Sequence, residues 1–218
     1  MKRGVKNKFS RIFKELVHHL PYSAVGVAAS LGILLGFEKM GWRGKPELFF
    51  HIAHPAHILI SAIVTTAMFW KYEQKFLKAC FIGLFCTHPV CTVSDIGIPY
   101  LGAFLLGTPV QFHLCIIEEP WLVFPASFLG ILLGILFLKW VERLTEFGHL
   151  SHVLISALAS IFYLISFDVS LWSGSIGMVF FITLVAVWLP CCLSDIVFPL
   201  AWVKGGHPPC CGHHPHEI

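Results

Sequence analysis

Two copies of one short motif carry most of the residues in this sequence that could do chemistry. The motif is Cys-x-x-Ser-Asp-Ile-x-x-Pro, and its copies run from Cys91 to Pro99 and from Cys191 to Pro199. Each copy lies inside a long apolar run, where burying a carboxylate in hydrocarbon costs about 2.5–3.5 kcal/mol. Each proline removes a backbone donor, which frees a carbonyl close to the acid. The repeated acid therefore indicates a functional site on two Pro-interrupted helices.

A second pattern, built on histidine, is repeated together with the first. The string from His54 to Ala62 reads His-x-x-His-Ile-Leu-Ile-Ser-Ala, and it recurs from His149 to Ala157 with one change, isoleucine to valine. A third string, Leu-Gly-Ile-Leu-Leu-Gly, occurs at 31–36 and again at 129–134. The three matches keep the same order and a spacing of roughly one hundred residues, which indicates an internal duplication.

The composition is that of a membrane protein. Of 218 residues, 56% are hydrophobic and only 12% are charged, whereas a soluble domain has roughly 25% charged residues. The net charge of +3 gives no indication of nucleic acid as a partner. Six apolar stretches approach or exceed the roughly 17–25 residues that cross a bilayer: 21–38, 48–70, 79–106, 121–140, 149–168 and 174–203.

The distribution of lysine and arginine predicts the topology. Residues 1–20 combine basic residues with apolar ones at helical spacing, which predicts an amphipathic interfacial helix on the cytoplasmic face. The segments on the same side as this helix carry most of the basic residues, so both termini are predicted to be cytoplasmic, in the plasma (inner) membrane. Each half then holds three helices, and an odd number inverts the second half relative to the first.

The sequence therefore predicts an all-α integral membrane protein with six transmembrane helices, arranged as two inverted three-helix repeats. The membrane domain is expected to span 21–204, with repeat one at about 21–106 and repeat two at about 120–203. Proline is expected to interrupt the third and sixth helices. A Cys/His-rich cytoplasmic tail at 205–218 is expected to capture metal outside the path through the membrane.

Each half offers two imidazoles, one thiol and one carboxylate, which together form a ligand set for a transition metal. On a helix the two histidines of a pair share a face, and so do the cysteine and aspartate that lie four residues apart. The set suits Zn²⁺, Fe²⁺, Co²⁺, Ni²⁺ or Cd²⁺, with zinc or iron favoured, in two stacked sites or one shared site. The predicted ligands are His54, His57, Cys91, Asp95, His149, His152, Cys191 and Asp195.

Both aspartates are predicted to bind the metal directly and to exchange protons with it. Replacing either Asp95 or Asp195 with asparagine is therefore expected to abolish pH-dependent metal binding and to leave the fold intact, because a neutral amide is cheaper to bury than a carboxylate.

Other polar residues have a lesser predicted role. Two serines lie beside the acids, a His pair and a Glu pair precede the first helix of each half, and two Cys and two His lie in the tail. These secondary residues are Ser94, Ser194, His18, His19, Glu118, Glu119, Cys210, Cys211, His213 and His214. A core role is expected for single His and Cys residues that lack a counterpart in the other half, namely Cys80, Cys86, His88, His51 and Cys115.

These features favour a proton-linked permease for a divalent transition-metal cation rather than an enzyme. The layout of three plus three inverted helices resembles the lysine-exporter type of metal and amino-acid exporters. That resemblance is architectural only. The sequence contains no nucleotide-binding motif, so transport is expected to draw on a gradient or on a separate energising subunit. The expected partners are the lipid bilayer, the cation and a possible second copy of the chain.

Two alternative functions stay open. One Pro-flanked cysteine per half, Cys91 and Cys191, is similar to the arrangement in membrane thiol carriers of the cytochrome-c-biogenesis type. A haem-binding variant of this redox function would use His57 and His152 as axial ligands. An intramembrane metalloenzyme with a zinc-bound water fits the same ligands but lacks a distinct catalytic acid or base.

Overall fold

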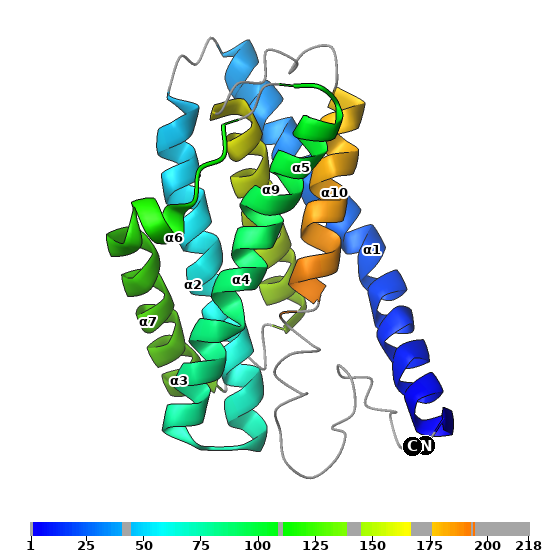
Figure 1. Cartoon of the computed structure of the whole chain (residues 1–218), viewed down its shortest axis with the longest axis vertical. Helices are drawn as coiled ribbons and strands as arrows, with labels where there is room; N and C mark the ends of the chain where they lie inside the picture. The colour runs from blue at the N-terminus through cyan, green and yellow to red at the C-terminus, as the bar shows by residue number, and fades with distance from the viewer. Residues whose placement is uncertain are drawn as a thin grey trace.

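The chain is all-helical in the part that the structure, a computed structural model, describes. That part covers residues 2–40, 45–108, 111–138, 145–166, 176–192 and 194, without the side chains of 2–15, 38, 145–149 and 192. The helices form one elongated bundle (Figure 1). In chain order they are α1 (Lys2–Lys39), α2 (Pro46–Tyr72), α3 (Phe76–Phe85), α4 (Thr87–Thr92), η1 (Val93–Gly97), α5 (Ile98–Leu105), α6 (Cys115–Glu118), α7 (Pro120–Leu136), α9 (Thr145–Ser166) and α10 (Ile176–Cys192).

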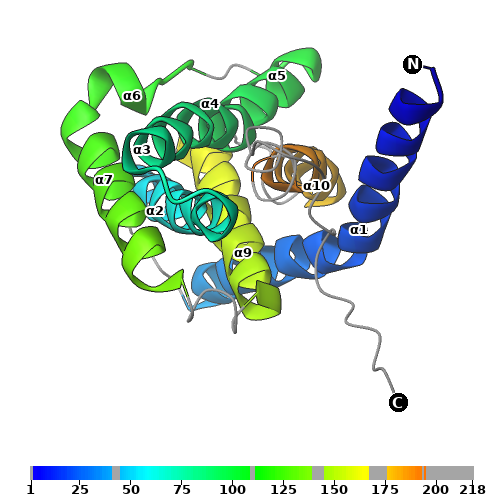
Figure 2. The same ribbon diagram turned by 90° about the horizontal axis from the view of Figure 1, so that it is seen from below.

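Helices α2 and α9 form the centre of the bundle. Helix α2 packs against α7 and α9, and α9 packs in turn against α1 and α10. The view along the bundle shows α2 and α9 side by side, with α7, the α3–α5 segment, α10 and α1 placed around them (Figure 2). The two helices that carry the repeated His pairs are therefore the most enclosed ones.

Among the described residues, three helices are long and apolar enough to cross a membrane. They are Leu16–Phe37, Pro46–Tyr72 and Phe76–Leu105, while Pro120–Leu136, Leu150–Ser166 and Ile176–Cys191 are shorter apolar helices. Large apolar side chains such as Leu77, Leu105 and Ile117 are more than 70% exposed, an arrangement that suits a lipid environment. The structure thus confirms an all-helical, membrane-type chain, and the six-span inverted arrangement is not confirmed by it.

The amphipathic segment predicted at 1–20 is continuous with the first apolar helix. Helix α1 runs from Lys2 to Lys39 and contains Pro21, and Figure 2 shows the helix bent in its middle. Proline inside a helix removes one hydrogen bond and commonly produces a bend of this kind. The expected boundary near residue 20 is therefore a bend within one helix.

The segment that carries the first Cys/Asp motif is bent locally and remains helical throughout. Residues Phe76–Leu105 form one apolar helical rod, in which Val93–Gly97 adopt a π-helical turn and Pro99 stands in the first turn of α5. Such π-turns insert one extra residue and are frequent at functional sites. The predicted interruption of the third helix is therefore a change of helix type at Asp95, with no gap in the backbone.

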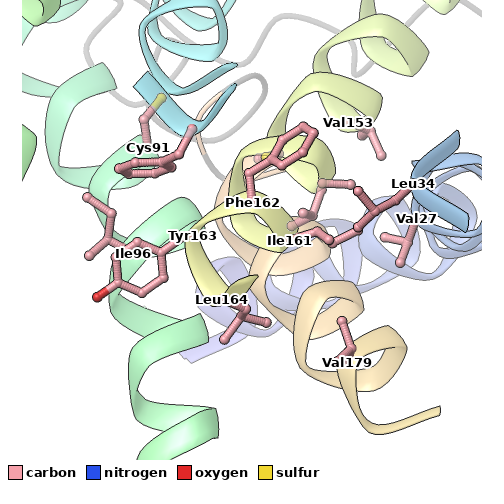
Figure 3. Close-up of a cluster of buried hydrophobic side chains, with 14 of the residues drawn as sticks. Val27, Leu34, Cys91, Ile96, Val153, Ile161, Phe162, Tyr163, Leu164 and Val179 are labelled. Carbon is pink, nitrogen blue, oxygen red and sulfur yellow. The ribbon is translucent and has the colours of Figure 1, made fainter. Parts of the chain in front are cut away.

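An apolar core surrounds the inner faces of α1, α9 and α10. Figure 3 shows Ile96 beside Tyr163 of α9, and it shows Val27 of α1 near Val153 of α9. All four side chains are 0% exposed. Cys91 belongs to the same cluster, so its thiol lies where the apolar core meets the polar centre.

Replacing Gly130 with alanine is expected to destabilise the bundle, and the same change at Gly32 is expected to be tolerated. A Cβ atom at Gly130 would lie 2.5 Å from the carbonyl oxygen of Leu59, so α7 and α2 would have to move apart. Gly32 is the equivalent residue in the first copy of the repeated string, and nothing lies within 4 Å of its Cβ position. Overpacking of this kind costs about 1–3 kcal/mol. Thermal unfolding in detergent tests this, and equal midpoints for the two variants would contradict it.

Candidate metal centre

A polar stripe on α2 faces a polar stripe on α9. His57, Ser61 and Thr65 follow one another at intervals of four residues on α2, and all three are buried. The buried residues His152, Ser156 and Ser160 repeat this spacing on α9. Residues four apart share one helix face, so the two stripes line a polar interior within an apolar bundle.

Asp95 lies at the π-turn of the third helix and accepts four hydrogen bonds. Its Oδ2 atom accepts from Nδ1 of His54 at 2.8 Å and from Nδ1 of His57 at 2.7 Å. Its Oδ1 atom accepts from Oγ of Ser94 at 2.8 Å and from Oγ of Ser156 at 3.0 Å. The carboxylate is 0% exposed, and these four donors satisfy both of its oxygens, as a buried charge requires.

The central cluster, as we name it, consists of His57, His152, Cys91 and Cys191. The Nε2 atoms of the two histidines are 2.7 Å apart, and each cysteine Sγ lies 3.8 Å from Nε2 of His57. The donors of His57, His152 and Cys191 all lie within 4.8 Å of one another. Cys91 joins this group of three through its contact with His57 alone, and all four side chains are at most 1% exposed.

The hydrogen bonds fix which nitrogen of His57 is available. Because Nδ1 donates to Asp95, the neutral imidazole keeps its lone pair on Nε2. That lone pair accepts a hydrogen bond from the N–H at Nε2 of His152. A carboxylate that holds the remote nitrogen is the usual outer partner of a metal-bound histidine, and it raises the basicity of the ligand.

The N···S spacing around Nε2 of His57 is close to that of a tetrahedral zinc site. With Zn–N and Zn–S bonds of about 2.0–2.1 Å and about 2.3 Å, tetrahedral ligands stand about 3.3 Å apart for two nitrogens and about 3.6 Å apart for nitrogen and sulfur. The N···S distances of 3.8 Å are near that value, and the N···N distance of 2.7 Å is shorter. An ion would therefore replace the His57–His152 hydrogen bond and separate the two rings by roughly half an ångström.

The predicted ligands occupy two different layers. Four of them, one His and one Cys from each half, meet in the central cluster, so the described residues form one shared site. His54 and Asp95 lie one layer out, and the two oxygens of Asp95 are already occupied by hydrogen bonds. The side chain of His149 and the whole of Asp195 lie outside the described residues.

The π-turn supplies a carbonyl that the opposite helix uses. In the π pattern the amide of Ile98 bonds to the carbonyl of Val93, so Pro99, which has no N–H, leaves the carbonyl of Ser94 free. Ser160 of α9 donates its hydroxyl to that carbonyl at 3.1 Å. In the second motif, Thr65 of α2 donates to the carbonyl of Ser194 at 3.4 Å, which is the equivalent contact in the other half.

The serines and threonines of the two stripes were not predicted from the sequence. Ser61 and Ser156 stand at matching places in the repeated His string, which was the available signal. Ser156 holds Asp95, and Ser61 contacts the hydroxyl of Ser194 at 3.1 Å. The secondary residues Ser94 and Ser194 therefore belong to the network around the centre.

A second group of possible metal ligands lies between α2 and α6, and we name it the α2–α6 cluster. It consists of His51, His113, Cys115 and Glu119. The donors of the first three lie within 4.8 Å of one another. The two Nε2 atoms are 3.1 Å apart, and Oε2 of Glu119 lies 3.4 Å from Nε2 of His51. A core role was expected for His51 and Cys115, and His113 was not singled out.

The acids of this region shape its electrostatics. Burial and the negative charge of Glu119 raise the pKa of the Cys115 thiol to about 12, so the thiol is protonated at neutral pH when no cation is present. The backbone N–H of Leu114 bonds to Glu118 and lowers the pKa of that carboxyl, and His113 lowers it further. Glu118 is therefore ionised, and its Oε2 atom accepts from Nδ1 of His113 at 2.9 Å.

The remaining predicted residues lie away from these two groups or outside the described part. His18 and His19 stack edge to face on α1, with ring centroids 5.5 Å apart. His88 donates to Oγ of Ser127, and Cys80 is a free thiol on α3. The residues of the tail, Cys210, Cys211, His213 and His214, lie outside the described residues.

No protein-family model matches the chain, and neither the search of curated proteins nor the search of solved structures found a match.

Proposed function

We propose that the protein is a membrane permease for a borderline divalent transition-metal ion, Zn²⁺ first among them, which binds at the central cluster. The observation that carries the proposal is the meeting of His57, His152 and both motif cysteines within one buried site. Two imidazoles and two thiolates are a set that Zn²⁺ prefers, whereas Mg²⁺ and Ca²⁺ require oxygen ligands. The cation is the substrate in this proposal.

The proposed architecture is six membrane-crossing helices in two inverted halves, with both termini cytoplasmic in the inner membrane. Contacts between equivalent residues support it, because His57 meets His152 and because the Ser160–Ser94 contact has its counterpart in Thr65–Ser194. Contacts between helices support it as well, since α7 packs on α2 as α1 packs on α9. Transporters built from inverted repeats carry their sites near the midplane at the repeat interface.

Binding at the central cluster is expected to release protons. Each cysteine must lose its thiol proton before sulfur can bind the ion, so one divalent ion displaces two protons if both thiols bind. His152 must also turn a lone pair toward the ion, which moves its remaining proton to Nδ1. Metal movement and proton movement are therefore coupled by charge balance in this proposal.

Thiol redox chemistry is the second candidate function, and one observation favours it. Both motif cysteines contact the same imidazole nitrogen, at 3.8 Å each, and an adjacent base can activate a thiol. Haem is less well supported, because axial ligands stand on opposite faces of a porphyrin, whereas His57 and His152 are in direct contact.

Transport measurements in proteoliposomes test the proposal. With a zinc-sensitive dye and a pH-sensitive dye inside the vesicles, the full-length protein is expected to carry Zn²⁺ across the bilayer with opposite proton movement. The Cys91→Ser variant is expected to lose this flux, and Cys80→Ser, which changes a free thiol on α3, is the matched control. Tight metal binding without any flux would overturn the permease, and a Cys91–Cys191 disulfide formed in turnover would indicate redox function instead.

A further inference from the structure

We propose that the α2–α6 cluster is a second binding site for a borderline divalent ion such as Zn²⁺. Metal binding there depends only on the donors of that cluster. Its role as a first binding stage before the central cluster rests on the proposed function.

The two histidines already stand at the separation that a metal ion needs. Their Nε2 atoms are 3.1 Å apart, close to the about 3.3 Å expected for two nitrogens on one tetrahedral zinc ion. The Sγ atom of Cys115 lies within 4.8 Å of both nitrogens. Three donors of two kinds are therefore in place before any rearrangement.

Glu119 supplies a fourth donor from the same side. Its Oε2 atom is 3.4 Å from Nε2 of His51, is shielded from solvent and makes no hydrogen bond within the part of the chain that the structure describes. A buried carboxylate oxygen in this condition is costly unless a cation or a donor meets it. Glu119 lies outside the group of three donors that are all within 4.8 Å of one another, so its carboxylate would have to turn toward them to complete a tetrahedral set of two nitrogens, one sulfur and one oxygen.

Glu118 has the supporting role at this site that Asp95 has at the centre. One of its oxygens accepts from Nδ1 of His113 at 2.9 Å, and the other accepts from the backbone N–H of Leu114 at 3.0 Å. The bond to Nδ1 leaves the lone pair of His113 on Nε2, directed at the cluster. The segment 107–120 contains no lysine or arginine, so its own residues offer no permanent positive charge to balance the two acids.

The two sites differ in access from outside the bundle. The side chains of His51 and His113 are 15% and 13% exposed, and that of Glu118 is 50% exposed, whereas His57 and His152 are 0% exposed. The α2–α6 cluster can therefore take an ion from solution without opening the bundle. His51, His54 and His57 follow one another every three residues along α2, so each step toward the centre is about 4.5 Å.

Counting bound metal in paired variants tests this second site. The full-length protein in detergent is titrated with Co²⁺ and Zn²⁺, with the sulfur-to-cobalt absorption and elemental analysis as readouts. Cys115→Ser and His113→Gln are each expected to bind one equivalent less than the parent and to lose part of the sulfur-to-cobalt band. Cys80→Ser is the control, and any ion held by the tail contributes equally to all variants.

The outcomes separate this proposal from the central one. If both sites bind, His57→Gln and Cys115→Ser each lose one equivalent, and the double variant loses two. If only the α2–α6 cluster binds, Cys115→Ser loses one equivalent and His57→Gln loses none. If Cys115→Ser, His113→Gln and Glu119→Gln all bind as many ions as the parent, the cluster is a hydrogen-bonded group only and the proposal is overturned.

Discussion

A His57→Gln variant is expected to lose at least a hundredfold in Zn²⁺ affinity at the central cluster and to lose metal transport. His57 contacts all three other members of the cluster. Structural zinc sites bind with about 10–16 kcal/mol, so an even share for one of four ligands is about 2.5–4 kcal/mol, or roughly a hundredfold and more. Glutamine keeps an N–H that can still meet Asp95, so the fold should persist.

The matched control for this experiment is His88→Gln. His88 is also buried on the third helical rod, but its hydrogen bond goes to Ser127 of α7 and it belongs to neither cluster. Competition with a chromophoric chelator measures the affinities. Equal affinity in the parent, His57→Gln and His88→Gln would mean that the central contacts only join helices, and the proposed function would fail with them.

An Asp95→Asn variant is expected to bind metal about 10–100-fold more weakly and to keep both its fold and its pH dependence. An amide oxygen can accept from the two imidazoles, and an amide NH₂ can donate to the serine hydroxyls, so the hydrogen bonds survive. The charge that raises the basicity of His57 is lost, and changes in such outer partners cost about 10–100-fold in affinity. This expectation differs from the one drawn from sequence, in which asparagine abolishes pH dependence.

The two expectations differ because Asp95 holds His57 by a hydrogen bond and is not itself a member of the central cluster. The protons that metal displaces come from the two thiols, and these remain in the variant, so affinity should still rise with pH. Asp95→Ala is the contrasting variant, because it leaves two imidazole N–H groups without their acceptor, at about 1–3 kcal/mol for each. Chelator titrations at several pH values, with unfolding midpoints measured alongside, distinguish the cases. A pH-independent affinity in Asp95→Asn would show that Asp95 itself binds the ion.

The repeated strings were sufficient to identify the residues at the centre of the bundle. They did not show which of these residues belong to the central cluster and which hold its members by hydrogen bonds. Duplication pointed to His57, His152, Cys91 and Cys191 because each has a counterpart in the other half of the sequence, and in the structure the other three side chains all contact His57. Hydrogen bonds in three dimensions decide which nitrogen of His57 keeps its lone pair. They also show that Asp95 acts on the cluster through His57. Spacing along a helix carries no information on that point.

The α2–α6 cluster could not be predicted because the duplication gave no reason to single out its histidines and its cysteine. His51 comes from α2, His113 precedes α6, Cys115 begins α6 and Glu119 follows it. Neither His51, His113 nor Cys115 has a counterpart in the other half of the sequence. Reliance on the duplication therefore assigned His51 and Cys115 to the core. The carboxylate pair at 118–119 was the sequence signal in this region, and a solvated interfacial patch was the favoured interpretation of it.

The π-turn at Val93–Gly97 gives the third helical rod a place where its register can change. An α-helix rotates by about 100° per residue, so moving the extra residue of the turn by one position would rotate Asp95 away from His54 and His57. Both imidazoles would then lose their acceptor together, and Pro99 limits how far the extra residue can move toward α5. In the proposed permease, a shift of one residue would change the hydrogen bonds around His57 without unwinding the helix.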